Sequence, residues 1–168
     1  MSALLTLADF TRPDLIVPTL RGGDQAGVLM ELSRRLHSVG VVSDLMQFYH
    51  AAFNREFLES THLGRELAVP HVRLPGLQQL IFALGRCVQP VPWTSAPRNL
   101  VRWVVLAAVP ATDLSDYLAL LAALTRAVQA GSFCQDLLAA PSADKMLAML
   151  QAVPLRGLPA AVGQPVMA

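Results

Sequence analysis

The sequence predicts an α/β fold, a sandwich in which helices pack against a mixed β-sheet. Short apolar segments bounded by proline or turn residues are typical of buried strands, and apolar residues repeating every 3.6 positions are typical of helices packed on a core. Helical segments lie both before and after the strands, an order that favours helices against a sheet. The 168 residues are enough for one compact domain with a sizeable core.

Four apolar segments are predicted to be strands: residues 15–17, 67–69, 80–87 and 100–109. The segment before Pro70 is extended because a proline excludes its predecessor from the helical region. The last segment is apolar at nearly every position, which predicts burial on both faces. Pro90, Pro92 and Pro97 indicate an irregular loop before it.

Three longer helices are predicted at about residues 25–39, 43–57 and 113–128. Asp24 and either Ser43 or Asp44 are candidate N-caps for the first two. Two shorter helices are expected to start at Ser132 and Ser142. After residue 153 the chain is rich in proline, glycine and small residues. We therefore expect one domain over residues 1–153 and a flexible tail over residues 154–168.

The composition excludes several classes of protein. It is 54% hydrophobic and 15% charged, with a net charge of +1, which is not typical of a disordered chain or a nucleic-acid-binding surface. The apolar run near Leu118–Leu124 is too short to span a membrane, and no signal peptide is evident. A cytoplasmic protein is the expectation. Cys87 and Cys134 lack the spacing of a zinc site or a disulfide scaffold, so no metal is expected.

One stretch, residues 54–73 or NREFLESTHLGRELAVPHVR, gathers residue types suited to phosphoryl chemistry. Pro70 fixes the backbone just before His71, which helps to hold the imidazole in one place. A neutral imidazole is a good nucleophile near pH 7 because its unperturbed pKa is about 6.5. His71 is therefore a candidate phosphoryl acceptor, although a histidine after an apolar run is, without context, more often structural.

The same stretch supplies groups that can bind a phosphoryl anion. Arg55 can clamp phosphate oxygens through two N–H groups. Its alternative role is a surface charge that complements the end of a helix. Ser60 and Thr61, with Gly64, form a polar turn whose hydroxyls and amides can gather around an anion. No glycine-rich nucleotide loop is present, and none is needed if the donor is a phosphohistidine.

The stretch resembles the active-site signature of a known family: the IIA domains of the bacterial phosphoenolpyruvate-dependent sugar phosphotransferase system. The resemblance is to the mannitol/fructose class, which includes the nitrogen-regulatory IIA proteins. Their signature is approximately REx(L/M)xSTxLGxxIAxPH. The matching positions are Arg55-Glu56, Ser60-Thr61, Leu63-Gly64, Ala68 and Pro70-His71. A weaker resemblance extends over about residues 3–153 and implies a three-layer α/β/α fold.

The resemblance also implies roles and partners. His71 would accept the phosphoryl group, Arg55 would lie beside it, and Ser60 and Thr61 would line the phosphate site. The donor would be a phosphocarrier similar to HPr. The acceptor would be a IIB domain, or the phosphorylated form would act on a regulatory target. Neither a cofactor nor direct membrane insertion is implied.

Two positions depart from the family pattern. Members commonly carry a second histidine near the start of the long C-terminal helix, where this chain has Tyr117. A phenol can donate a hydrogen bond to phosphate, but it does not change charge near neutral pH. Packing at the edge of the core is its alternative role. The turn around His62 is bulkier than in nitrogen-regulatory members, and Arg73 is either a steering charge or a solvated one.

Three functions remain open from the sequence. The first is a phosphoryl-carrier component of the phosphotransferase system. The second is a regulatory binding module that is switched by phosphorylation of His71, in which Tyr117 replaces the second histidine. The third is a degenerate member of the fold without phosphoryl chemistry.

Overall fold

A mixed sheet forms the middle layer of the protein. The structure is a computed structural model that describes residues 4–94 and 98–157. Its strands are β1 (Ile16–Leu20), β2 (Leu67–Ala68), β3 (His71–Leu74), β4 (Ile81–Pro92) and β5 (Leu100–Pro110). Strand β1 is parallel to β4, β4 is antiparallel to β5, and β5 is parallel to both β2 and β3. The predicted mixed sheet is confirmed.

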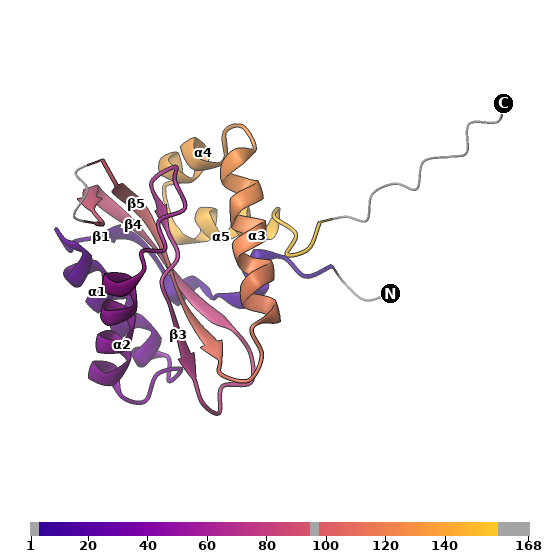
Figure 1. Cartoon of the computed structure of the whole chain (residues 1–168). Coiled ribbons are helices and arrows are strands. Elements are labelled where there is room, and N and C mark those ends of the chain that lie inside the picture. Colours follow the sequence, from indigo (N-terminus) through magenta and orange to yellow (C-terminus); the bar gives the residue numbers. More distant parts are fainter. Residues whose placement is uncertain (1–3, 95–97, 158–168) are drawn as a thin grey trace.

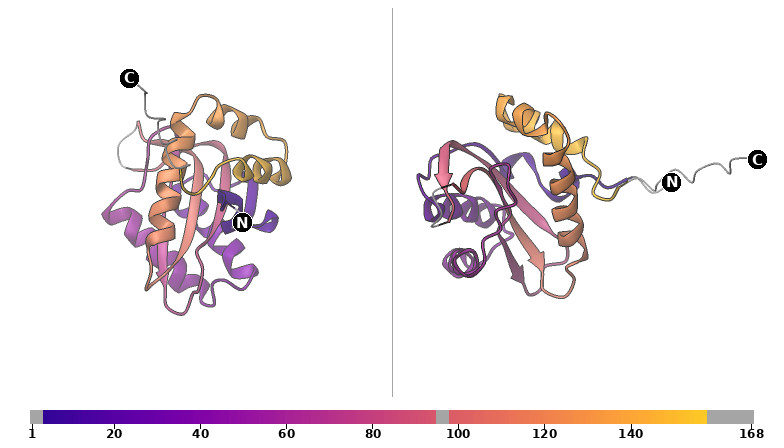
Figure 2. Two further views of the ribbon diagram at one scale, coloured as in Figure 1. Left: turned by 90° about the vertical axis from the view of Figure 1, so that its right-hand side faces the viewer. Right: turned by 45° about the horizontal axis from the view of Figure 1, so that its top comes forward.

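Helices cover both faces of this sheet (Figures 1 and 2). One face carries α1 (Gln25–Ser38) and α2 (Leu45–Leu58), and the other carries α3 (Ser115–Gln129), α4 (Phe133–Ala139) and α5 (Ala143–Gln151). Two short 3₁₀ helices, η1 (Leu7–Phe10) and η2 (Pro13–Leu15), precede β1. Each face buries its own apolar cluster, one around Leu32 and Phe48 and one around Leu120 and Met146. The three-layer α/β/α sandwich is confirmed.

The helices α1 and α2 were predictable because the residue that caps each one lies directly before it in the sequence. The carboxylate of Asp24 accepts a hydrogen bond from the Gly27 amide at 2.7 Å, and that of Asp44 accepts from the Gln47 amide at 3.0 Å. Each satisfies an amide that has no partner within the first turn of its helix. Of the two candidate caps for α2, the structure selects Asp44.

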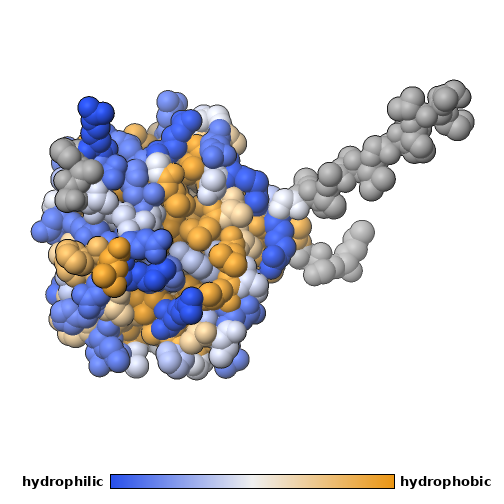
Figure 3. All heavy atoms as spheres, viewed as in Figure 1, coloured by the Kyte–Doolittle hydropathy of each residue, from blue (hydrophilic) through white to orange (hydrophobic). Residues whose placement is uncertain are grey.

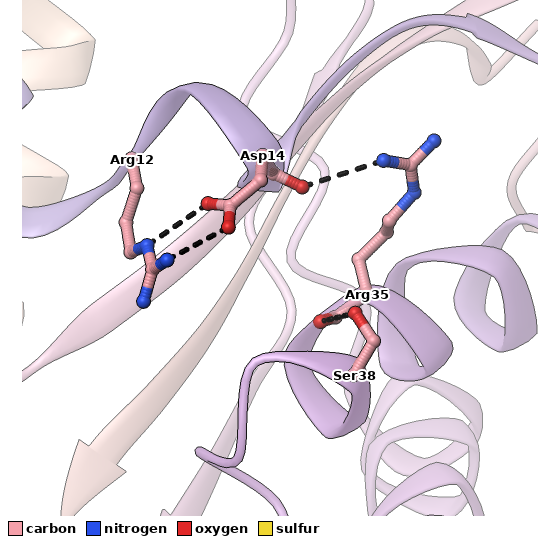
Figure 4. Close-up of polar contacts among 4 residues, drawn as sticks. All are labelled: Arg12, Asp14, Arg35 and Ser38. Carbon is pink, nitrogen blue, oxygen red and sulfur yellow. Dashed lines mark hydrogen bonds and ion pairs between the residues drawn. The ribbon is translucent and has the colours of Figure 1, made fainter.

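A polar cluster connects the end of α1 to the segment before β1 (Figure 4). The guanidinium of Arg12 donates twice to the Asp14 carboxylate, at 2.9 and 2.8 Å. Arg35 of α1 donates to the backbone carbonyl of Asp14 at 3.4 Å, and the Ser38 hydroxyl donates to the carbonyl of Arg35 at 2.7 Å. These groups are exposed, so the cluster contributes modestly to stability.

Pro70 divides one edge of the sheet into two short strands. Ala68 of β2 lies opposite Val104, and His71 of β3 lies opposite Ala107. Pro70 has no N–H to donate, but its carbonyl accepts a hydrogen bond from the Ala107 amide at 2.9 Å. Val72 packs in the cluster under α1 and α2. Since side chains alternate along a strand, His71 faces the opposite side, toward α3.

One strand was not predicted, and one prediction of a loop is wrong. The sequence does not predict β3, which is only four residues long and follows a proline. The irregular loop expected around Pro90 and Pro92 is instead the end of β4, which pairs with β5 beyond a register shift between Arg86 and Val91. A bulge of this kind tolerates prolines because it leaves residues outside the ladder. Pro97 lies outside the described residues.

The packed chain continues slightly past the expected domain boundary at residue 153. Leu155 is buried, and its amide donates to the carbonyl of Leu5 at 2.8 Å. Residues 158–168 of the expected tail lie outside the described residues. The division into a domain and a flexible tail remains a prediction.

Within residues 4–94 and 98–157, no single helix is both long and apolar enough to cross a membrane. Helices α3 and α4 meet the criteria of length and composition only when taken together, with a bend of 89° between them.

Candidate functional site

The end of α2, the loop that follows it, the start of β3 and the first turn of α3 meet on one side of the protein. Helix α2 carries Arg55, the loop carries Ser60 and Thr61, β3 begins with His71 and α3 supplies Tyr117. The rings of His71 and Tyr117 lie 4.2 Å apart between centroids, at an interplanar angle of 35°. The charge of Arg55 acts on both rings. Residues far apart in the sequence are therefore neighbours here.

The imidazole of His71 presents one nitrogen to solvent. The residue is 6% exposed as a whole. Its Nδ1 atom is buried and has no hydrogen-bond partner among the described residues. Nε2 also has no such partner, yet it is not among the buried atoms that lack one. Nε2 is thus the ring atom that an incoming group can reach. A buried and unpartnered nitrogen in a native site calls for a functional explanation.

The surroundings of His71 keep its ring neutral. Burial lowers the pKa of the imidazole to about 4, and the positive charges of Arg55 and Arg73 add to this effect. A neutral ring retains the lone pair that a nucleophile needs. The ring is therefore neutral at any pH well above 4.

Tyr117 lines the site with its ring and also carries a hydroxyl group. It is buried, and its hydroxyl donates to the backbone carbonyl of Val69 at 3.4 Å. Burial raises the pKa of the phenol to about 12, opposed by Arg55 and reinforced by Glu56. The phenol is therefore neutral at physiological pH. Its ring packs on the imidazole of His71 while its hydroxyl is directed to the backbone.

Arg55 is a cation of the site whose hydrogen-bonding capacity is not used by any other described residue. It lies exposed in the last turn of α2. Among the residues that the structure describes, its guanidinium forms neither a hydrogen bond nor an ion pair, although its charge lowers the pKa of His71. A guanidinium left in this state can donate two hydrogen bonds to an oxyanion.

The two hydroxyls predicted to line a phosphate site differ in their surroundings. The Ser60 hydroxyl is exposed and accepts a hydrogen bond from the His62 amide at 3.3 Å. The Thr61 hydroxyl donates to Glu56 at 2.6 Å and accepts from the Val69 amide at 3.1 Å. Ser60 therefore has its proton free for a ligand, whereas the proton of Thr61 is used within the protein.

Glu56 is a residue of the site that the sequence reasoning did not assign a role. It is only 4% exposed, and its carboxylate accepts hydrogen bonds from the Thr61 amide and from Trp93 Nε1, at 3.1 and 2.8 Å. The only feature of the sequence that indicated a role for Glu56 was its position next to Arg55 in the motif. Its partner Trp93 comes 37 residues later and has no local signal.

His62 and Arg73 are the two further residues that the sequence analysis considered for this site. His62 forms an isolated bridge with Ala68, and the left-handed backbone of Gly64, Arg65 and Glu66 turns the loop back toward β2. Arg73 is exposed on β3, and its charge lowers the pKa of His71. Among the described residues, these positions form neither a hydrogen bond nor a ring contact with His71.

No group of three or more histidine, cysteine or acidic side chains within residues 4–94 and 98–157 is placed to hold a metal ion. Cys87 and Cys134 are both free thiols, the first buried and the second half-buried. Burial raises the pKa of the Cys87 thiol to about 12, so it is not a reactive nucleophile.

Comparison with known proteins agrees with this fold. Residues 9–153 match the family described as "Phosphoenolpyruvate-dependent sugar phosphotransferase system, EIIA 2". The chain belongs to this family, whose members include sugar-specific and nitrogen-regulatory proteins, and a general role in phosphoryl transfer follows from it.

Two relatives represent these branches. The chain is 28% identical over 149 residues to the 2-O-α-mannosyl-D-glycerate-specific EIIABC component of Escherichia coli K12, which covers 88% of the chain but only 23% of that protein. It is 25% identical over 150 residues to a nitrogen regulatory protein of Bradyrhizobium diazoefficiens, covering 89% of the chain and 97% of that protein. The chain thus spans less than a quarter of the first relative.

Solved structures share the fold. The nitrogen regulatory protein IIA-Ntr of Neisseria meningitidis superposes with a TM-score of 0.76 at 25% identity, covering 86% of this chain and 98% of that one. The mannitol IIA of Escherichia coli has a TM-score of 0.67 at 20% identity, covering 83% and 97%. A complex of the mannitol IIA with phosphorylated IIB is also similar in fold, with a TM-score of 0.66 at 19% identity, covering 83% and 95%.

Proposed function

We propose that the chain is a phosphoryl carrier that accepts a phosphoryl group on Nε2 of His71 from an HPr-like phosphocarrier. The observation that carries the proposal is a neutral imidazole with one accessible nitrogen, next to a guanidinium that has no hydrogen bond or ion pair with another described residue. As the new bond from Nε2 to phosphorus forms, the bond from phosphorus to the donor's imidazole breaks. The phosphoryl group moves without oxidation, and no cofactor is required.

The surrounding groups act mainly through charge and position. Negative charge is spread over three phosphoryl oxygens in the transition state, and Arg55 is placed to stabilise it. Ser60 offers a neutral donor, and Thr61 holds the loop that carries it. Tyr117 holds the imidazole by packing against it, where other members of the family use a second histidine.

An apolar surface beside the site supports docking of a protein partner. Phe57 and Leu58 at the end of α2 are 81% and 83% exposed, and Leu118 of α3 is 60% exposed. A space-filling view shows apolar surface on this side of the protein, interspersed with hydrophilic side chains (Figure 3). We infer that the phosphocarrier, and a IIB domain or regulatory target, bind here in turn.

A regulatory role is the second candidate. Tyr117 at the position of the second histidine favours it, as does the nearly full-length match to a nitrogen regulatory protein. Phosphorylation would add nearly two negative charges within an apolar surface, which opposes docking through repulsion and desolvation. In this role the phosphoryl group on His71 is a signal, and its transfer to a IIB domain is not required.

Mass spectrometry after incubation with phosphoenolpyruvate, enzyme I and HPr tests the acceptor. We expect a mass gain of one phosphoryl group in the parent and in His62→Ala, the matched control, and none in His71→Ala. No gain in the parent, or an equal gain in His71→Ala, would reject the proposal. Adding a IIB domain then separates the roles, because a carrier loses its phosphoryl group to IIB and a purely regulatory protein retains it.

A further inference from the structure

The buried carboxylate of Glu56 is bound by residues other than His71. Glu56 accepts three hydrogen bonds: from Trp93 Nε1 at 2.8 Å, from the Thr61 amide at 3.1 Å and from the Thr61 hydroxyl at 2.6 Å. A buried charge is tolerated only when donors satisfy it, and hydrogen bonds to ionised groups are the stronger ones. Glu56 therefore connects the end of β4 to the loop after α2 through strong contacts.

The carboxylate determines the direction of the Thr61 hydroxyl. A hydroxyl has one proton, and this one is donated to Glu56. The oxygen is left to act as an acceptor, and it accepts from the amide of Val69 at 3.1 Å. The backbone carbonyl of Thr61 accepts from the same amide at 3.2 Å. The chain of contacts therefore runs from Glu56 through Thr61 to Val69.

Val69 is held from its other side by α3. Its carbonyl accepts from the Tyr117 hydroxyl, as described above, and its side chain is fully buried. Only Pro70 separates it from His71, and the fixed φ of proline leaves little freedom to absorb a displacement. A shift of the Val69 amide is thus passed on to the imidazole.

We propose that Glu56 is a positioning residue for phosphoryl transfer, acting on His71 through Thr61, Val69 and Pro70. The inference rests on the proposed function, since it names what places the acceptor nitrogen of that same site. Glu56 does not touch the phosphoryl group. It keeps the loop and the start of β3 in the geometry at which Nε2, Arg55 and the incoming group are aligned.

Replacement of Glu56 by glutamine tests this with almost no change of shape. In Glu56→Gln only the amide oxygen can accept, so it can replace the carboxylate oxygen that Trp93 and the Thr61 amide share, but the amide nitrogen cannot accept from the Thr61 hydroxyl. We expect phosphoryl transfer to His71 to slow by roughly 10- to 100-fold, because a displacement near 1 Å can cost as much as 100-fold. Thr61→Val should slow it similarly, whereas Thr61→Ser, which keeps the hydroxyl, should stay within about twofold of the parent.

A double variant and a matched control make the test specific. If Thr61 acts through Glu56, adding Thr61→Val to Glu56→Gln should slow transfer only slightly more than either change alone. Glu59→Gln makes the same chemical change three residues away. Glu59 is exposed, and its side chain has no hydrogen bond to another described residue. Glu59→Gln should transfer at the parent rate.

Two measurements separate positioning from mere stability and from failure of the proposed function. Transfer rates are compared per folded molecule, and hydrogen exchange of the Val69 amide and the ring resonances of His71 are followed by NMR. Faster exchange and shifted resonances in Glu56→Gln, with slowed transfer, support the inference. A parent-like rate per folded molecule overturns it, even if the melting temperature falls. If the parent itself is not phosphorylated, the proposed function fails, and parent-like exchange and ring resonances in Glu56→Gln then overturn the positioning role independently.

Discussion

Two polar clusters in this protein use charged side chains in opposite ways. In the first, which we call the Arg86 cluster, the guanidinium of Arg86 on β4 donates to four backbone carbonyls: Pro18, Leu137, Leu138 and Ala140, at 2.7 to 3.2 Å. In the second, around His71, neither the guanidinium of Arg55 nor Nδ1 of the histidine has a hydrogen-bond partner among the described residues. The Arg86 cluster is closed, because its guanidinium is used by hydrogen bonds within the protein. The His71 site is open, because polar groups in it have no partner among the described residues.

The difference separates structural from functional use of charge. Arg86 links β1, β4 and the end of α4, where few amides are left to pair with the last carbonyls of a helix. The Leu137 carbonyl also accepts from the Ala140 amide at 3.4 Å. Every contact it makes holds elements of the fold together. The His71 site leaves polar groups unpaired, which lowers stability but leaves them available to a ligand. Substitutions at the two arginines should therefore have opposite consequences.

The largest effect is expected at Arg55. Arg55→Ala should slow phosphorylation of His71 by about 100- to 1000-fold, because a donor aimed at developing charge contributes that much. Its free energy of unfolding should stay near that of the parent. Arg34→Ala, which removes an exposed arginine of α1, is the control for net charge. Rapid-quench assays and urea unfolding measure the two quantities, and a stable Arg55→Ala with parent-like rates would place Arg55 outside the site.

The next effect is the pH dependence of stability. The pKa of His71 is about 4 in the folded protein and about 6.5 when unfolded, so the unfolded chain binds more protons between these values. The stabilisation from the neutral ring is complete above pH 6.5 and is lost as pH falls toward 4. Its size is about 3 kcal/mol.

Urea unfolding between pH 7 and pH 4 measures this, with His71→Gln as the reference. The parent should lose about 3 kcal/mol more than the variant over that range. If the parent and His71→Gln lose equal free energy of unfolding, the imidazole is hydrated in the folded protein and its burial does not exclude water.

A smaller effect on stability is expected in the Arg86 cluster. Arg86→Met should lower the free energy of unfolding by about 2 kcal/mol, because it removes charge-assisted hydrogen bonds and leaves carbonyls unpaired. Arg86→Lys should not restore it, since an ammonium lacks the planar array of donors. Phosphorylation per folded molecule should be unchanged. A loss of transfer in a folded Arg86→Met would show that the two clusters are coupled.

The smallest effect is expected for Tyr117→Phe. The hydroxyl donates to Val69 over 3.4 Å, a weak hydrogen bond, so its removal should cost about 0.5–1 kcal/mol. The ring that packs on His71 is retained, and we expect transfer rates within about threefold of the parent. If transfer slows more than tenfold while folding is intact, the hydroxyl of Tyr117 contacts the phosphoryl group directly.

The sequence was a good guide wherever the cause of structure is local. The caps at Asp24 and Asp44 and the apolar periodicity of the helices depend on residues within one or two turns. The motif over residues 54–73 was evident for the same reason, because its groups are close along the chain. From it, His71 and Arg55 could be selected before any coordinates.

Other features depend on partners distant in the sequence. Strand β3 and the part of β4 beyond Pro90 are strands because β5 pairs with them, against local preference. The carboxylate of Glu56 is satisfied by Trp93, and Arg86 finds its acceptors 51 to 54 residues away on one side and 68 on the other.

The sequence by itself determined the helices, the mixed α/β class and the residue types of the site, since these follow from short-range sterics, periodicity and spacing. Only the tertiary structure decided which nitrogen of His71 is accessible, that its ring is neutral and which of the neighbouring polar groups are already paired. The physical reason is that burial and hydrogen-bond satisfaction are set by surfaces brought together from separate segments of the chain.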